Sequence, residues 1–155
     1  MTTPFLQGDV RFFEGEPATH APALAAYPDP GGVYTIGFGH TGPDVYEGLS
    51  CTVAEAVAWL AHDIAHAEHE LDLNLPWWRT LNDPRQDVLV QMCFNLGIGG
   101  LLEFHHMLAD CQLSDWNGAA AEMLASEWSV QVGNRAKVLS KTMLTGVRVP
   151  PETVL

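Results

Sequence analysis

The sequence predicts an α+β fold in which helices dominate, and three observations support this class. Two short extended runs flank a Pro-Gly-Gly turn and indicate one small hairpin within residues 24–47. A long helix is indicated after it, because apolar residues recur at alternating spacings of four and three. Further short helices, separated by glycines, are indicated as far as residue 146.

The composition bounds the kind of protein. A chain of 155 residues is long enough for one domain with a buried core. The content of 47% hydrophobic and 17% charged residues argues against disorder. No apolar run approaches the ~20 residues that span a bilayer, so no membrane partner is expected. The net charge of −12 also argues against nucleic acid, because neutralising phosphates requires Lys and Arg.

The first expected helix covers residues 4–13. The hairpin comes next, and its turn is indicated by Asp29 followed by Pro30-Gly31-Gly32, residues that favour a tight reversal. The second run, residues 33–38, alternates enough to form a strand. A carboxylate at the turn and the hydroxyl of Thr35 on the following strand are groups that can position a water molecule, which is a first indication of a hydrolase.

The long helix is expected to begin at a capping box formed by Thr52 and Glu55. Its apolar positions form one stripe, which consists of Val53, Val57, Leu60, Ile64, Ala67 and Leu71. A core helix then covers residues 84–96, with Asp83 as N-cap, Pro84 in the first turn and Gln86 reaching back. Gly97 is expected to end it. Shorter helices are expected at about 101–110, 115–126 and 134–145, with breaks at Gly133 and Gly146.

No metal site is predicted. His62, Asp63 and His66 are spaced like part of a zinc motif, but they lie off the apolar stripe, and Asp replaces the Glu that such a mechanism uses as a base. A solvated helix face is the simpler interpretation. The three cysteines are odd in number and far apart, so neither a disulfide framework nor zinc is indicated.

Several motifs, in a consistent order, resemble those of the phage-type lysozymes, the endolysins that cleave the bacterial cell wall. They are Phe13-Glu14-Gly15, the run from Tyr27 to Thr41 (YPDPGGVYTIGFGHT), Met92–Gly97 (MCFNLG), and Trp128 to Lys137 followed by Thr145-Gly146. The resemblance covers roughly residues 5–146. It implies a single lysozyme-like domain over residues 1–155. An N-terminal lobe of about 14–60 carries the hairpin, and a long helix links it to a C-terminal helical lobe of about 76–146 plus helix 4–13.

The resemblance implies a muramidase, a glycosidase that hydrolyses β-1,4 bonds between N-acetylmuramic acid and N-acetylglucosamine in peptidoglycan. Glu14 would be the general acid, and Asp29 with Thr35 would direct water, since this chemistry needs a proton donor and a second carboxylate. Asn95 and Arg135 would bind substrate, with Arg135 also pairing with Glu14. No cofactor, an inverting outcome and a monomer are expected.

Alternatives stay open for several of these residues. In the family pattern the acid and the Tyr equivalent to Tyr27 lie seven residues apart, whereas Glu14 and Tyr27 lie thirteen apart. Removing residues 16–21 restores the spacing, which indicates an insertion. Without that gap His20 stands in the acid's place, and Glu16 is a third candidate.

Three other residues have a simpler reading that competes with a role in binding. Arg135 fits a solvated helix residue, Asn95 fits a helix end, and His40 fits a structural brace better than a substrate contact. The rival to an enzyme is a catalytically impaired lysozyme-like binding domain or a virion structural domain.

The start of the chain has neither a basic segment nor an apolar segment of the kind found in signal peptides. The protein is therefore expected in the cytoplasm of the producing cell, from which a holin pore would release it, or else in a virion. Because the wall is also anionic, activity is expected to rise with moderate salt, which screens repulsion.

Overall fold

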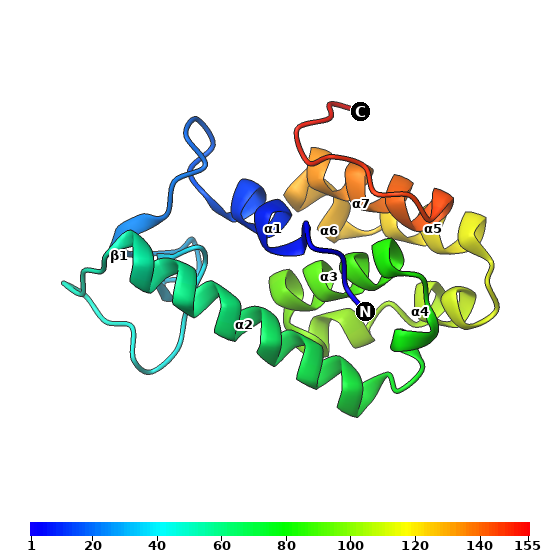
Figure 1. The fold of residues 1–155 in the computed structure, drawn as a ribbon, viewed down its shortest axis with the longest axis horizontal. Coiled ribbons are helices and arrows are strands. Elements are labelled where there is room, and N and C mark those ends of the chain that lie inside the picture. Colours follow the sequence, from blue (N-terminus) through cyan, green and yellow to red (C-terminus); the bar gives the residue numbers. More distant parts are fainter. The chain divides into compact units, whose positions relative to one another are not determined.

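The computed structural model describes all 155 residues, Met1–Leu155. It contains seven α-helices, one short 3-10 helix and one two-stranded antiparallel sheet (Figure 1). The predicted α+β class with dominant helices is therefore confirmed. The chain divides into two compact units, one formed by Gln7–His66 and the other by Met1–Leu6 together with Ala67–Leu155.

The unit Gln7–His66 carries the sheet. Helix α1 (Leu6–Glu14) precedes strands β1 (Ala23–Pro28) and β2 (Tyr34–Gly37). Tyr27 pairs with Thr35 across the two strands. The predicted turn is present between them, because the amide of Asp29 donates to the carbonyl of Val33 at 2.9 Å. The turn therefore carries a carboxylate at its start and leads directly into the strand that carries Thr35.

Helix α2 (Val53–Asn74) begins at the predicted capping box. The amide of Glu55 donates to Thr52 Oγ1 and the amide of Thr52 donates to Glu55 Oε1, each at 3.1 Å. The predicted stripe is buried at Leu60, Ile64, Ala67 and Leu71. Val57 is only half-buried, and Val53, the first helical residue, has 49% of its surface exposed; the buried residue of the first turn is Ala56. His62, His66 and His69 are exposed, as a solvated face requires.

The other unit is helical. After the 3-10 helix η1 (Trp78–Thr80) it contains α3 (Asp83–Leu102), α4 (His105–Gln112), α5 (Trp116–Leu124), α6 (Glu127–Val132) and α7 (Asn134–Thr145). Helix α5 packs against both α4 and α7, and α3 packs against α7 (Figure 1). The fully buried side chains of this unit include Leu89, Met92, Leu101, Met107, Met123 and Met143.

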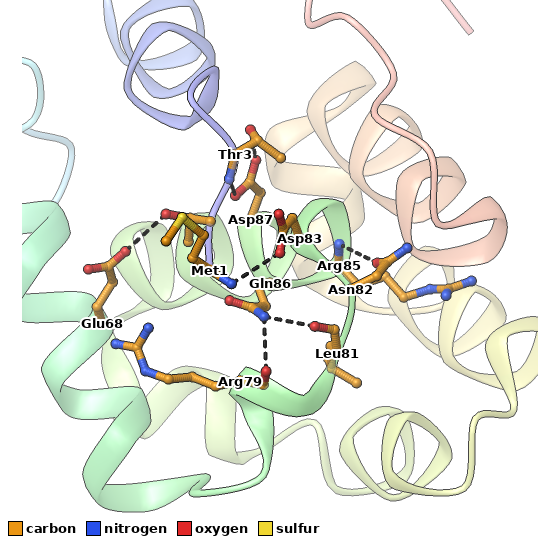
Figure 2. A network of polar contacts seen from close by, with 11 residues as sticks. Met1, Thr3, Glu68, Arg79, Leu81, Asn82, Asp83, Arg85, Gln86 and Asp87 are labelled. Carbon is orange, nitrogen blue, oxygen red and sulfur yellow. Dashed lines mark hydrogen bonds and ion pairs between the residues drawn. The ribbon is translucent and has the colours of Figure 1, made fainter.

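One prediction about α3 is wrong and another is confirmed in part. The N-cap is Asn82 rather than Asp83: the Asn82 side chain accepts from the amide of Arg85 at 3.2 Å. Asp83 instead binds the amino group of Met1 at 3.0 Å (Figure 2). The predicted stop at Gly97 is present as a non-helical break within α3. That residue is a kink with φ 73° and ψ 162°, and the helix resumes beyond it, where Leu101 is fully buried.

The boundaries of the later helices in the structure also differ from the predicted ones. The helix expected at about 101–110 begins only at His105, because residues as far as Leu102 belong to α3. The helix expected at about 115–126 ends at Leu124, and Ser126 caps a separate helix, α6. The predicted breaks at Gly133 and Gly146 are confirmed, and both residues have positive φ.

The first residues of the chain are held within this helical unit by polar contacts. The amide and the hydroxyl of Thr3 both donate to the carboxylate of Asp87 (Figure 2). The hydroxyl of Thr2 donates to Glu68. The Gln86 side-chain amide donates to the carbonyls of Arg79 and Leu81. None of the helices has, by itself, the length and hydropathy of a membrane-spanning segment. Helices α3 and α4 reach that length and hydropathy only together, and they are bent by 104° where they meet.

Candidate active site

Helix α1 ends at Glu14, the predicted acid. Its last backbone hydrogen bond runs from the amide of Gly15 to the carbonyl of Arg11 at 2.9 Å. A Cβ atom at Gly15 would lie 2.3 Å from both the carbonyl carbon and the carbonyl oxygen of His20, so only glycine fits here. The Glu-Gly pair therefore marks a point where the chain leaves the helix and another segment packs directly against it.

That segment is the predicted insertion, residues 16–21. It forms a closed loop, because the amide of Glu16 donates to the carbonyl of Ala21 at 2.9 Å. The two ends of the loop lie side by side, so six residues can be added without displacing the sheet or the helix that flank them. This geometry is what an insertion requires, and the role of Glu14 as the acid stays a prediction.

The two competing candidates for the acid lie in this loop. Glu16 is exposed. The His20 ring is half-buried, and its Nδ1 lies 2.8 Å from the carbonyl oxygen of Phe12. An imidazole committed to a main-chain carbonyl is poorly placed to protonate a glycosidic oxygen, which favours Glu14.

Asp29 is held by the turn that it begins. Its Oδ1 accepts from the amide of Val33 at 2.8 Å, while Oδ2 has no hydrogen-bond partner within the protein. Thr35 is buried, with 6% of its surface exposed, and its hydroxyl donates to the carbonyl of Val33 at 3.1 Å. Both predicted residues are thus oriented by Val33, one by its amide and the other by its carbonyl.

Tyr27 connects the two predicted carboxylates. Burial raises the pKa of its phenol, and the negative charges of Glu14 and Asp29 raise this pKa further. Glu14, Tyr27 and Asp29 all belong to the unit Gln7–His66. The sequence prediction did not include Tyr27 as a site residue, although its place opposite Thr35 and two residues before Asp29 was a usable signal.

His40 is the brace that was expected. Its Nδ1 lies 2.8 Å from Asp63 and its Nε2 lies 2.9 Å from Asp44, and the ring stacks on Trp59 with centroids 5.0 Å apart. Burial lowers the pKa of His40, but the two carboxylates outweigh burial and raise it above its ordinary value. Two backbone hydrogen bonds with Ile36 connect this brace to the residue after Thr35.

Asn95 and Arg135, the predicted substrate-binding residues, lie in the helical unit. Asn95 is exposed, and its Oδ1 accepts from Trp128 Nε1 at 2.7 Å. Trp128 in turn lines a cavity of about 450 Å³. Arg135 is not a solvated residue, since only 6% of its surface is exposed, and it donates to Gln91 Oε1 at 3.4 Å. Its pairing with Glu14 stays a prediction.

The structure contains no cluster of three or more His, Cys, Asp or Glu side chains arranged to bind a metal ion. The groups that the sheet-bearing unit does bring together are a carboxylate at a helix end, a carboxylate at a turn, a hydroxyl and a phenol. Such a set is suited to moving protons and orienting water.

Comparison with known proteins bears on this site. The family model for phage lysozyme matches residues 19–143, a range that includes Asp29, Thr35, Asn95 and Arg135 and begins after Glu14. The pre-baseplate central spike protein Gp5 of Enterobacteria phage T4 is 31% identical over 100 residues, which are 63% of this chain and 17% of the spike protein. The probable T4-type lysozyme 1 of Dictyostelium discoideum is 25% identical over 162 aligned residues, covering 88% of this chain and 92% of that protein.

Proposed function

Because the chain belongs to the phage lysozyme family, we propose that it is a peptidoglycan-degrading muramidase. The reaction would be hydrolysis of β-1,4 bonds between N-acetylmuramic acid and N-acetylglucosamine in bacterial cell walls. One observation carries the proposal: within one compact unit, the turn holds Asp29 by a single oxygen and leads into the strand that carries Thr35, while helix α1 of the same unit ends at Glu14. A glycosidase needs two carboxyl groups that share one site.

In the proposed reaction Glu14 protonates the glycosidic oxygen as the bond breaks. Asp29 accepts a proton from the attacking water through Oδ2, the oxygen that its turn leaves without a partner. Thr35 helps to hold this water. Its hydroxyl proton is already donated to Val33, so the hydroxyl oxygen has lone pairs that can accept a hydrogen bond from the second O–H group of the water. Water bound in this way attacks the sugar directly, which gives an inverted product.

Asn95 and Arg135 are proposed to bind the glycan strand. Asn95 would act in part through Trp128, since it fixes the indole that lines the cavity of about 450 Å³. Aromatic rings with an adjacent hydrogen-bonding group suit the faces and edges of sugars. No cofactor takes part in this scheme, and the working form is a monomer.

The biological setting is also a proposal. The protein would lyse the producing host from within, after a holin pore gives it access to the wall. A second candidate is a catalytically impaired lysozyme-like binding domain or a virion structural domain, and the spike protein among the relatives favours the virion setting. The match of the family model from residue 19 onward is compatible with both candidates, since it omits the acid.

Product analysis separates the two. Purified peptidoglycan is incubated with the full chain, the soluble fragments are reduced with borohydride, and their ends are identified by mass spectrometry. A muramidase yields fragments that end in reduced N-acetylmuramic acid, and the Asp29→Asn variant yields few of them. Sedimentation of the protein with intact peptidoglycan, without soluble fragments, would instead support the binding domain.

A further inference from the structure

We propose that His20 is a positioning residue for Glu14: the loop of residues 16–21 folds back and caps the end of helix α1 through this imidazole. The inference rests on the proposed function, since it names a device that holds the proposed acid in place.

The backbone hydrogen bonds at the end of α1 leave one carbonyl to be satisfied. The amide of Gly15 bonds the carbonyl of Arg11, four residues earlier, as in a regular helix. The next amide, that of Glu16, would bond the carbonyl of Phe12 if the helix continued. It bonds Ala21 instead. The Phe12 carbonyl is thus one of the groups that a helix end leaves open, and it needs another donor.

His20 supplies that donor. Its Nδ1 lies 2.8 Å from the Phe12 carbonyl oxygen. The imidazole also stacks on the Phe12 ring, with centroids 3.9 Å apart and planes 19° from parallel. The loop therefore holds the last turn of α1 at two points on one residue, and that residue is two positions before Glu14.

The rest of the loop is built to keep the imidazole there. The amide of His20 bonds the carbonyl of Glu16 at 2.6 Å, which closes the loop from inside. His20 adopts φ 56°, a left-handed conformation that non-glycine residues rarely take and that marks a local constraint. Its carbonyl lies where a side chain at Gly15 would be. Gly15 therefore lets the loop approach the residue that follows Glu14.

This arrangement determines which nitrogen of the His20 ring carries a proton. Because a carbonyl only accepts, His20 Nδ1 must carry a proton. In the neutral ring Nε2 is then the unprotonated nitrogen. The same hydrogen bond explains why His20 does not act as the acid, although one register of the sequence places it there. In this arrangement it acts on the chemistry only through the backbone that presents Glu14.

Two variants of His20 in the full chain separate its functions. His20→Asn keeps an N–H donor near the position of Nδ1 and tolerates positive φ. His20→Phe keeps an aromatic ring but has no donor. Ala18→Asn, an exposed change in the same loop, is the matched control. Peptidoglycan hydrolysis is measured at limiting and saturating substrate, alongside the melting temperature and the amide exchange rate of Gly15 by NMR.

The proposal expects kcat of His20→Phe to fall by about 10- to 100-fold with KM little changed, because misplacing a catalytic group by about 1 Å has effects of this size. Hydrolysis by His20→Asn should stay close to wild type, as should hydrolysis by the control. The Gly15 amide should exchange faster in His20→Phe only, and the ¹⁵N shifts of His20 should show a protonated Nδ1.

The proposal is overturned if His20→Phe is folded and as active as His20→Asn, or if Nε2 carries the proton of the neutral ring. An inactive wild-type protein would count against the proposed function alone. In that case the Gly15 exchange rates and the His20 tautomer still decide whether the imidazole holds the helix end.

Discussion

Replacing His40 by Phe should destabilise the protein in a way that depends on pH. The variant keeps an aromatic ring that can stack on Trp59, but it removes both donors to Asp63 and Asp44. Two carboxylates can be satisfied together only by the doubly protonated imidazolium, because a neutral imidazole has one N–H. The stabilisation is therefore tied to the charge on His40.

The magnitude follows from the exposure of the two partners. The Asp63 side chain is 24% exposed, and a hydrogen bond to a charged group of this kind contributes about 1.5–3 kcal/mol. The Asp44 side chain is 56% exposed, so solvent screening reduces the contribution of its hydrogen bond with His40 to about 0.2–1 kcal/mol. The sum is about 2–4 kcal/mol. For a chain of this size that corresponds to a fall in Tm of roughly 5–12 °C.

The sign of the pH dependence follows from the direction of the shift. The pKa of His40 is higher in the folded protein than in the unfolded chain, where it is about 6.5. The contribution is therefore fully present below about pH 6.5 and is lost as pH rises through the raised folded value. At the acid end, the hydrogen bond to His40 lowers the pKa of Asp44, so the Asp44 contribution is lost only as pH falls through that lowered value.

Thermal unfolding followed by circular dichroism at pH 6 and pH 9 measures the effect. We expect the gap between wild type and His40→Phe to be large at pH 6 and clearly smaller at pH 9. His106→Phe, a change of an exposed histidine, should alter Tm little at either pH. A gap that is equal at the two pH values would refute the reasoning, and so would a gap at pH 6 no larger than that of the control.

Two further predictions concern the helical unit. Asn82→Ala should lower the free energy of unfolding by about 1–2 kcal/mol in denaturant titrations, because it removes the N-cap of α3 and the hydrogen bond to the Gly146 carbonyl. Asp83→Ala should change it by less than about 0.5 kcal/mol, since its partner is the exposed chain terminus; the reverse order would contradict the assignment of the cap. In thiol labelling of the native protein at pH 8, Cys93 and Cys111 should stay unmodified until unfolding, because burial raises the pKa of these thiols to about 11 and about 12. Cys51 is half-buried and should react first, and early labelling of either other thiol, read by mass spectrometry, would count against this order.

Local signals in the sequence predicted much of the fold. The capping box of Thr52 and Glu55 forms as expected, because both partners lie within one turn of helix. The turn at Asp29 and the breaks at Gly133 and Gly146 depend on backbone preferences of single residues, which are equally local. Features of this kind can be predicted because only a few backbone conformations suit the residues of one short segment.

Other features depend on partners that are distant in sequence. Asn82 and Asp83 are both good N-caps by residue type, and the choice between them involves the amino group of Met1, which binds Asp83. Gly97 suggests the end of a helix, but burial of Leu101 favours resuming it. These choices are made by tertiary packing and not by local preference.

The candidate site shows the same division. The positions of Asp29 at the turn and of Thr35 on the following strand were predictable from the hairpin pattern, and their roles in catalysis stay predictions. The capping of Phe12 by His20 was not, because it requires a loop that closes on itself and a histidine with positive φ. The hydrogen bond from Trp128 to Asn95 joins residues 33 positions apart and has no signal in either segment alone.

The central claim is that Glu14 is the proton donor, and a matched pair of substitutions tests it directly. The rate of reducing-end release from purified peptidoglycan is measured for wild type, Glu14→Gln and Glu16→Gln, with each variant confirmed as folded. We expect hydrolysis to be lost in Glu14→Gln and retained in Glu16→Gln, because the second residue is exposed in the loop. Hydrolysis by Glu14→Gln at the wild-type rate would contradict the assignment of the acid and the mechanism built on it.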